Sequence, residues 1–128
     1  MTAPAVEPPK VQSGEGFTDK LRRRREFDAV YSSGFKVPAR QFVLFILPNT
    51  LGHSRLGMTI GRRIGKAVSR NRTRRRLREI FRRQSTELGA FDIVIHGRPG
   101  IAECGLAELE GEFLEGIARF RKKWKNGR

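Results

Sequence analysis

The sequence predicts an α+β fold in one domain, because helical and strand-like segments alternate in a chain of 128 residues, a typical length for one domain. Apolar or alternating runs at 40–47, 56–61 and 91–96 are typical of β-strands. A segment with a period of about 3.6 residues separates the second run from the third. The expected order is helix, two or more strands, helix, strand, helix, around a small mixed sheet.

The N-terminal part combines an arm with a short helix. Residues 1–16 are rich in proline and glycine and poor in large apolar side chains, which is typical of disordered segments. A helix is expected at 26–31, because two serines and Gly34 follow as a C-terminal stop. Phe27 and Tyr31 are four residues apart and share one face of this helix.

The run at 40–47 is apolar on both faces, which indicates a buried strand. Its two faces consist of Phe42, Leu44 and Ile46 and of Val43, Phe45 and Leu47. The turn-like residues that follow predict a hairpin with the strand at 56–61. Gly57 and Gly61 leave one face of that second strand bare, which often marks the close approach of another group.

A long helix is expected at 67–88, where Gly89 ends it. Its apolar seam contains Leu77, Ile80, Phe81, Gln84 and Leu88. Most of its arginines lie off this seam: Asn71, Arg75, Arg78 and Arg82 fall between about 100° and 160° from Leu77, and Arg72, Arg76 and Arg83 between about 220° and 260°. A last helix is expected at 106–124, with the seam Leu109, Phe113, Ile117 and Phe120.

The positive charge is concentrated in this long helix and the residues before it. The chain has a net charge of +14, and residues 62–83 contribute +10 of it, through ten arginines, one lysine and one glutamate. Arginine binds phosphate oxygens through two parallel hydrogen bonds and stacks on bases. The pattern favours a folded RNA as the partner. An anionic membrane is disfavoured, because the narrow apolar seam is needed for the core.

The sequence offers few residues with which the protein itself could catalyse a reaction. Cys104 is the only cysteine, and His53 and His96 are isolated from each other. The glycines at 61 and 65 lack the spacing and the hydroxyl of a phosphate-binding P-loop. No metal site is expected in the protein. The absence of a long apolar run or a secretory signal predicts a cytoplasmic protein.

Residues 66–79 resemble the signature of the bacterial ribonuclease P protein family, with Arg70-Asn71-Arg72 as its hallmark. The similarity extends over about residues 21–124. It includes Leu21, the helix that ends at Gly34, and the segments 40–45, 56–60, 65–68 and 98–99.

The resemblance implies a domain at 17–125 followed by a basic tail at 126–128. It implies the order α-β-β-β-α-β-α with a left-handed βαβ crossover, similar to the second domain of a small-subunit ribosomal protein. Such crossovers are rare. In function, it implies a protein that assists a catalytic RNA in removing the 5′ leader of precursor tRNA. Catalysis and most Mg²⁺ binding would then belong to the RNA.

The resemblance also assigns roles to individual residues. Contacts with the catalytic RNA are expected from Arg62, Arg63, Lys66, Arg70, Asn71, Arg72, Arg74, Arg75 and Arg78. A cleft for the single-stranded leader is expected over Phe27, Tyr31 and Phe45. The expected partners are one catalytic RNA per protein and precursor tRNA, without DNA or membrane. No role is assigned to the arginines at 22–25 or to Arg76.

Three alternatives remain open from the residues alone. The three aromatic side chains could be ordinary core. The chain could bind RNA architecturally, for example on the ribosome. It could also be a nuclease that acts without RNA, although the glutamates of the last helix resemble an exposed face more than a metal site.

Overall fold

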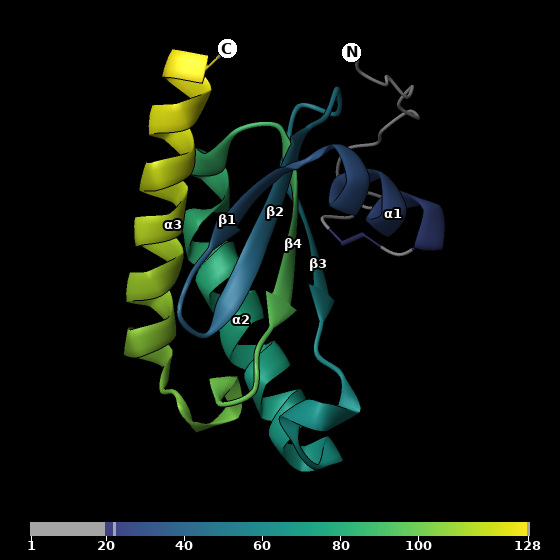
Figure 1. Cartoon of the computed structure of the whole chain (residues 1–128), viewed down its shortest axis with the longest axis vertical. Helices are drawn as coiled ribbons and strands as arrows, with labels where there is room; N and C mark the ends of the chain where they lie inside the picture. The colour runs from purple at the N-terminus through teal and green to yellow at the C-terminus, as the bar shows by residue number, and fades with distance from the viewer. Residues whose placement is uncertain (1–19, 22, 128) are drawn as a thin grey trace.

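The computed structural model describes residues 20, 21 and 23–127, which form a four-stranded sheet with helices on both faces (Figure 1). The helices are α1 (Arg24–Ser33), α2 (Ala67–Leu88) and α3 (Leu106–Gly127). The strands are β1 (Phe35–Pro38), β2 (Phe42–Pro48), β3 (Arg55–Thr59) and β4 (Phe91–Gly97). Two short 3₁₀ turns are η1 (Arg62–Ile64) and η2 (Ile101–Glu103). The predicted arm at 1–16 lies outside the described residues, and the predicted tail begins inside α3.

The strand order is β1-β2-β4-β3, with β3 parallel to β4 and the other pairs antiparallel. The predicted hairpin between 40–47 and 56–61 is therefore wrong, because β4 lies between these two strands. β4 is apolar on both faces and suits a central position, whereas the glycine-containing β3 lies at the edge. The hairpin partner of β2 is the short β1, which ends at Pro38, a residue suited to an edge strand.

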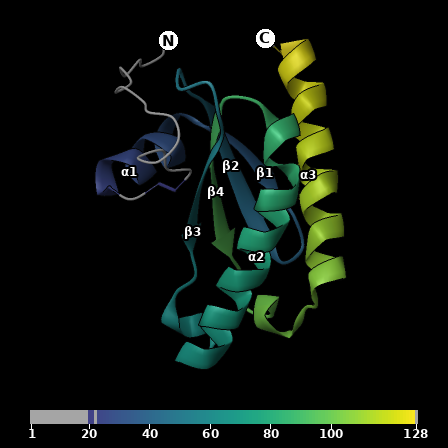
Figure 2. The same cartoon turned by 180° about the vertical axis from the view of Figure 1, so that it is seen from behind.

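The parallel pair β3 and β4 is connected by a left-handed crossover. Figure 1 shows both strands pointing down, with β4 to the left of β3, and Figure 2 shows α2 on the opposite face from α1. A chain that descends in β3, ascends behind the sheet in α2 and moves left into β4 traces a left-handed turn. This confirms the rare handedness that the family resemblance implies.

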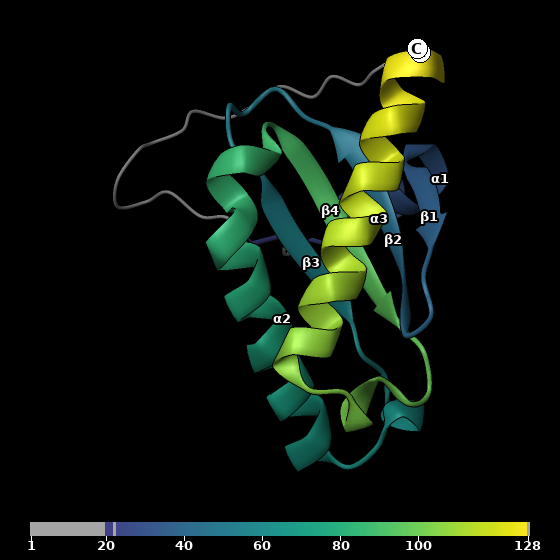
Figure 3. The same cartoon turned by 90° about the vertical axis from the view of Figure 1, so that its left-hand side faces the viewer.

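The larger core lies between the sheet and the pair α2 and α3, which pack side by side (Figure 3). The predicted seams are confirmed, since Leu77, Ile80, Phe81 and Leu88 of α2 and Leu109, Phe113, Ile117 and Phe120 of α3 are buried. From the sheet, Phe42, Leu44 and Ile46 point into this core. Two helices and one face of the sheet thus form the main hydrophobic layer.

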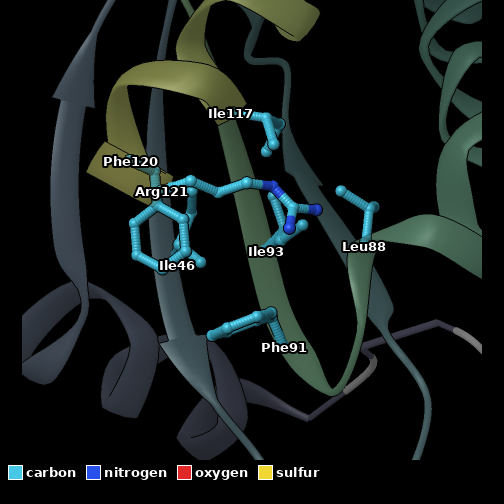
Figure 4. A pocket seen from close by; sticks show the side chains of 7 residues that line it. All are labelled: Ile46, Leu88, Phe91, Ile93, Ile117, Phe120 and Arg121. Atoms are coloured by element: carbon cyan, nitrogen blue, oxygen red, sulfur yellow. The ribbon is translucent and has the colours of Figure 1, made fainter. Parts of the chain in front are cut away.

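An apolar recess at one end of this core is lined by residues of β2, α2, β4 and α3 (Figure 4). Arg121 extends across it and donates a hydrogen bond from Nη2 to the carbonyl oxygen of Glu87 at 2.9 Å. Beside it, the ring of Phe120 contacts Phe35, Phe91 and Trp124 at centroid distances of 5.2 to 5.7 Å. Aromatic rings and the aliphatic part of an arginine therefore close this end of the core.

A smaller core lies between α1 and the other face of the sheet. Its buried residues are Leu21, Val30 and Val94, with Phe27, Tyr31, Phe45 and Leu47 packed against them. The predicted bare face of β3 is explained here, because a Cβ at Gly57 would lie 2.7 Å from the ring of Phe27. β2 thus contributes one face to each core, as its apolar pattern predicts.

A polar cluster anchors α1 at the beginning of β3. Arg55 donates two hydrogen bonds to Asp92, from Nε at 2.9 Å and from Nη2 at 2.8 Å, and its Nη1 lies 3.2 Å from Oε2 of Glu26 in α1. Burial alone would lower the pKa of Arg55, but the hydrogen bonds and charges of Asp92 and Glu26 outweigh it and raise that pKa. The guanidinium therefore remains charged and connects α1 to two strands.

Candidate nucleic-acid interface

The basic segment begins where the chain leaves β3 and enters α2, beyond the end of the sheet (Figure 1). Gly65 adopts φ +150°, a conformation that side chains disfavour, and Lys66 then starts the helix with an extended backbone. The side chains of Arg62, Arg63 and Lys66 are exposed. Three of the predicted RNA-binding residues therefore form a positively charged end of the molecule.

A second group of predicted residues forms an exposed stripe along α2. Asn71, Arg75 and Arg78 are exposed and lie on the side that the helical angles predict. Within the described residues, neither Arg75 nor Arg78 has a hydrogen-bond or ion-pair partner. Their guanidinium groups are therefore uncompensated and available to phosphate oxygens.

Arg70 and Arg74 lie closer to the sheet and support the segment before α2. Arg70 donates from Nη1 to the carbonyl oxygen of Gly65 at 2.7 Å, and Arg74 from Nη2 to that of Ile60 at 3.3 Å. Arg74 also donates to Oδ1 of Asn71 at 3.2 Å. Since a guanidinium carries five N–H donors, each arginine retains donors for an RNA phosphate while it holds this loop in place.

Arg72 is the predicted contact that the structure places apart from the others. It is half-buried, with its Nε buried and without a hydrogen-bond partner in the described part of the chain. Arg76, one turn later, donates from Nη1 to the carbonyl oxygen of Cys104 at 2.7 Å. This side of α2 therefore faces η2, and Arg72 does not belong to the exposed stripe.

The last two arginines of α2 are neutralised by acidic side chains. Arg82 lies 2.6 Å from Glu79, and Arg83 lies 3.3 Å from Glu79 and 2.7 Å from Glu110 of α3. The hydrogen bond from Arg82, with further contributions from Arg83, lowers the pKa of Glu79. The unpaired arginines Arg75 and Arg78 thus precede the paired arginines along α2.

The three predicted cleft residues come together on the opposite face of the sheet, under α1. The ring of Tyr31 packs edge-on against Phe45 at 4.7 Å, and Phe27 covers Gly57. All three aromatic side chains are only half-buried. They pack against the small core and keep part of their surface exposed to solvent.

His96 joins this group through the hydroxyl of Tyr31. The hydroxyl of Tyr31 is hydrogen-bonded both to Oγ1 of Thr59 at 2.8 Å and to Nδ1 of His96 at 2.9 Å. His96 is exposed, and its ring lies 5.9 Å from that of Tyr31. The alternation of β4 places His96 on the same face as Val94, which was the signal available in the sequence.

The register of the sheet connects the surroundings of Tyr31 with the basic end. Four residues stand in one row across the sheet beside Tyr31: Pro38, Val43, His96 and Thr59. Thr59 ends β3, and Arg62 and Arg63 follow within one short turn. A single-stranded chain lying on this row would therefore reach the basic segment at the end of β3.

The described residues contain no group of three histidine, cysteine, aspartate or glutamate side chains that could hold a metal ion. In the same part of the chain, no helix is long and apolar enough to cross a membrane. The chemical capacity of this surface lies in its arginines and aromatic rings.

Comparisons with known proteins agree on one family. The family model described as Ribonuclease P matches residues 17–121. A ribonuclease P protein component from Stutzerimonas stutzeri (strain A1501) is 42% identical over 104 residues, which cover 80% of this chain and 79% of the relative.

Two solved structures share the fold. The RNase P protein from Thermotoga maritima is 32% identical, with a TM-score of 0.70, and the match covers 78% of this chain and 96% of that protein. A Staphylococcus aureus RNase P protein mutant, described as defective in mRNA degradation activity, is 25% identical, with a TM-score of 0.75 and coverage of 80% and 88%. The chain therefore belongs to the family of ribonuclease P protein components.

Proposed function

We propose that this chain is the protein subunit of ribonuclease P and assists a catalytic RNA in removing the 5′ leader from precursor tRNA. One observation carries the proposal: Tyr31, of the aromatic row formed by Phe27, Tyr31 and Phe45, is hydrogen-bonded to Thr59 at the end of β3, and the chain continues from there into the exposed basic segment and the unpaired arginines of α2. The arginines suit the phosphates of a folded RNA, and the aromatic rings suit the bases of a single-stranded leader. Membership in the family supports the same function.

The stripe on α2 docks the catalytic RNA in this proposal. Arg75 and Arg78 offer forked donors to phosphates, and Arg62, Arg63 and Lys66 extend the contact beyond the helix. Arg70 and Arg74 hold the loop from which this extension projects. Binding through phosphates releases counterions, so the affinity decreases as salt rises. One protein per RNA is expected, as the family resemblance implies.

Catalysis is assigned to the RNA and its Mg²⁺ ions. When bound there, Mg²⁺ would stabilise the charge that develops on the reacting phosphate. The protein contributes fixed positive charge close to crowded phosphates. The RNA therefore needs less Mg²⁺ to reach its active conformation when the protein is present.

The leader is assigned to the row formed by Phe27, Tyr31 and Phe45. Bases stack on aromatic rings without regard to sequence, which suits leaders of variable sequence. His96 and Thr59 fix the ring of Tyr31 through its hydroxyl. The protein would then favour precursor tRNA over mature tRNA, because only the precursor carries a leader.

The decisive experiment is precursor tRNA cleavage at low Mg²⁺ with the cognate RNA alone, the protein alone and both together. We expect the protein to raise the rate of the RNA at low Mg²⁺ and to be inactive by itself. An unchanged rate on adding the protein would contradict the proposal. Cleavage by protein that has been freed of RNA would instead assign catalysis to the chain.

A second candidate function is degradation of mRNA, because the similar Staphylococcus aureus RNase P protein mutant is described as defective in such an activity. The same basic and aromatic surfaces could bind any RNA with a single-stranded segment. The protein without RNA, incubated with an mRNA that lacks tRNA sequences, tests this candidate. Cleavage that persists after nuclease treatment and repurification of the protein would support it.

A further inference from the structure

Three consecutive arginines around the start of α1 have no part in the surfaces described so far. Arg23 precedes the helix, and Arg24 and Arg25 begin it, all three exposed. Arginine is unfavourable at this position, because the free N–H groups of a helix N-terminus carry partial positive charge and favour acidic side chains. Residues that oppose local stability in this way often belong to functional sites.

The arginines occupy different faces of α1. At 100° per residue, Arg24 lies about 60° from Phe27 around the helix axis, on the same side as Tyr31 at about 40°. Arg25 lies about 160° from Phe27, on the side away from the sheet.

The contacts of α1 identify which side of the helix borders the open part of the cleft. Glu26 lies about 100° from Phe27 in the opposite direction and reaches Arg55 at the beginning of β3. Tyr31 reaches Thr59 at the end of the same strand, beside the exposed His96. The open side is therefore that of Tyr31, and Arg24 shares it while Arg25 does not.

We infer that Arg24 binds a phosphate of the leader beyond the nucleotides that stack on the aromatic row; this inference rests on the proposed function. Phe27 and Tyr31 are separated by about 6 Å along the helix axis, and Arg24 precedes Phe27 by about 4.5 Å. These steps are comparable with one nucleotide. A leader that enters at Tyr31, beside the basic end of the molecule, and runs along α1 therefore meets Arg24 after Phe27.

Arg24 is available for this contact despite its neighbour Asp28. Its Nε lies 3.9 Å from Oδ2 of Asp28, and the two side chains are 85% and 69% exposed. An ion pair this long and this exposed contributes little and is easily exchanged. A phosphate offers a shorter, charge-assisted contact to the same guanidinium.

The experiment measures the affinity of the reconstituted holoenzyme, without turnover, for precursor tRNAs whose leaders are shortened one nucleotide at a time. For Arg24→Gln we expect affinity for long leaders to fall about three- to tenfold. We expect no loss for leaders that end within the aromatic row or for mature tRNA. Arg25→Gln removes the same charge from the same turn and serves as the matched control, with unchanged affinity throughout.

Three results would overturn the inference: equal affinity of Arg24→Gln and wild type at every length, an equal loss for mature tRNA, or an equal loss in Arg25→Gln. A loss that includes mature tRNA would instead indicate contact with the catalytic RNA.

Tyr31→Leu tests the proposed leader cleft separately, with an expected loss of about fivefold or more for every precursor whose leader reaches the row. If Tyr31→Leu loses nothing, the leader cleft itself is wrong.

Discussion

Gly57 is the residue on which the position of α1 depends most directly. A Cβ there would lie 2.7 and 2.8 Å from ring atoms of Phe27 and 3.0 Å from Leu21. Gly57→Ala should therefore displace Phe27, destabilise the protein by about 1 to 3 kcal/mol and weaken binding of precursor tRNA more than of mature tRNA. Urea unfolding and the two affinities measure these effects.

Gly61→Ala is the natural control for this substitution. The sequence marked both glycines as bare positions, but nothing lies within 4 Å of a Cβ at Gly61 and its φ of −83° suits any residue. We expect its free energy of unfolding to remain that of the wild type. Equal stability of Gly57→Ala would contradict the close packing described here. The two glycines differ only because α1 packs against Gly57 and not against Gly61. The sequence of β3 alone does not reveal where α1 packs.

At the scale of elements, the unpaired Arg75 and Arg78 of α2 precede two arginines, Arg82 and Arg83, that pair with acidic side chains. Arg75→Gln with Arg78→Gln should weaken assembly with the catalytic RNA and reduce the slope of affinity against salt by about one unit per lost phosphate contact. Arg82→Gln with Arg83→Gln removes the same charge from the same helix. These arginines are paired with Glu79 and Glu110, so we expect a much smaller change in the slope. Similar slopes for the two double variants would show that only total charge matters.

The elements also differ in how far the sequence determined them. The bounds of α2 follow from its helical period and from Gly89, both of which are local signals. The pairing of strands is not local: β2 pairs with β4 across more than forty residues, and the short β1 carries too few residues for a pattern. The exposed stripe could be derived from the helical angles, whereas the separate environment of Arg72 depends on where η2 packs.

On the scale of the whole molecule, the sheet separates a large core from a small one. The core under α2 and α3 contains many fully buried side chains, whereas the core under α1 contains three buried residues and four half-buried ones. Fewer buried apolar contacts mean a lower free energy of local opening. Phe27, Tyr31 and Phe45 thus lie on the side with fewer buried contacts, where the ion pairs of Arg55 with Glu26 and Asp92 hold α1 against the sheet.

This asymmetry predicts the pattern of amide hydrogen exchange in the full chain. Amides of α1 should exchange through local opening, while those in the buried parts of α2 and β4 should require global unfolding. Glu26→Gln should accelerate exchange in α1 alone, because it weakens the contact with Arg55 without touching the larger core.

Binding of a precursor with a long leader to the holoenzyme should slow exchange in α1 relative to binding of mature tRNA, since stacked bases would add the contacts that the small core lacks. Equal opening free energies for α1 and α2 would contradict the local opening of α1. Equal protection by the two tRNAs would contradict the stabilisation of α1 by a bound leader.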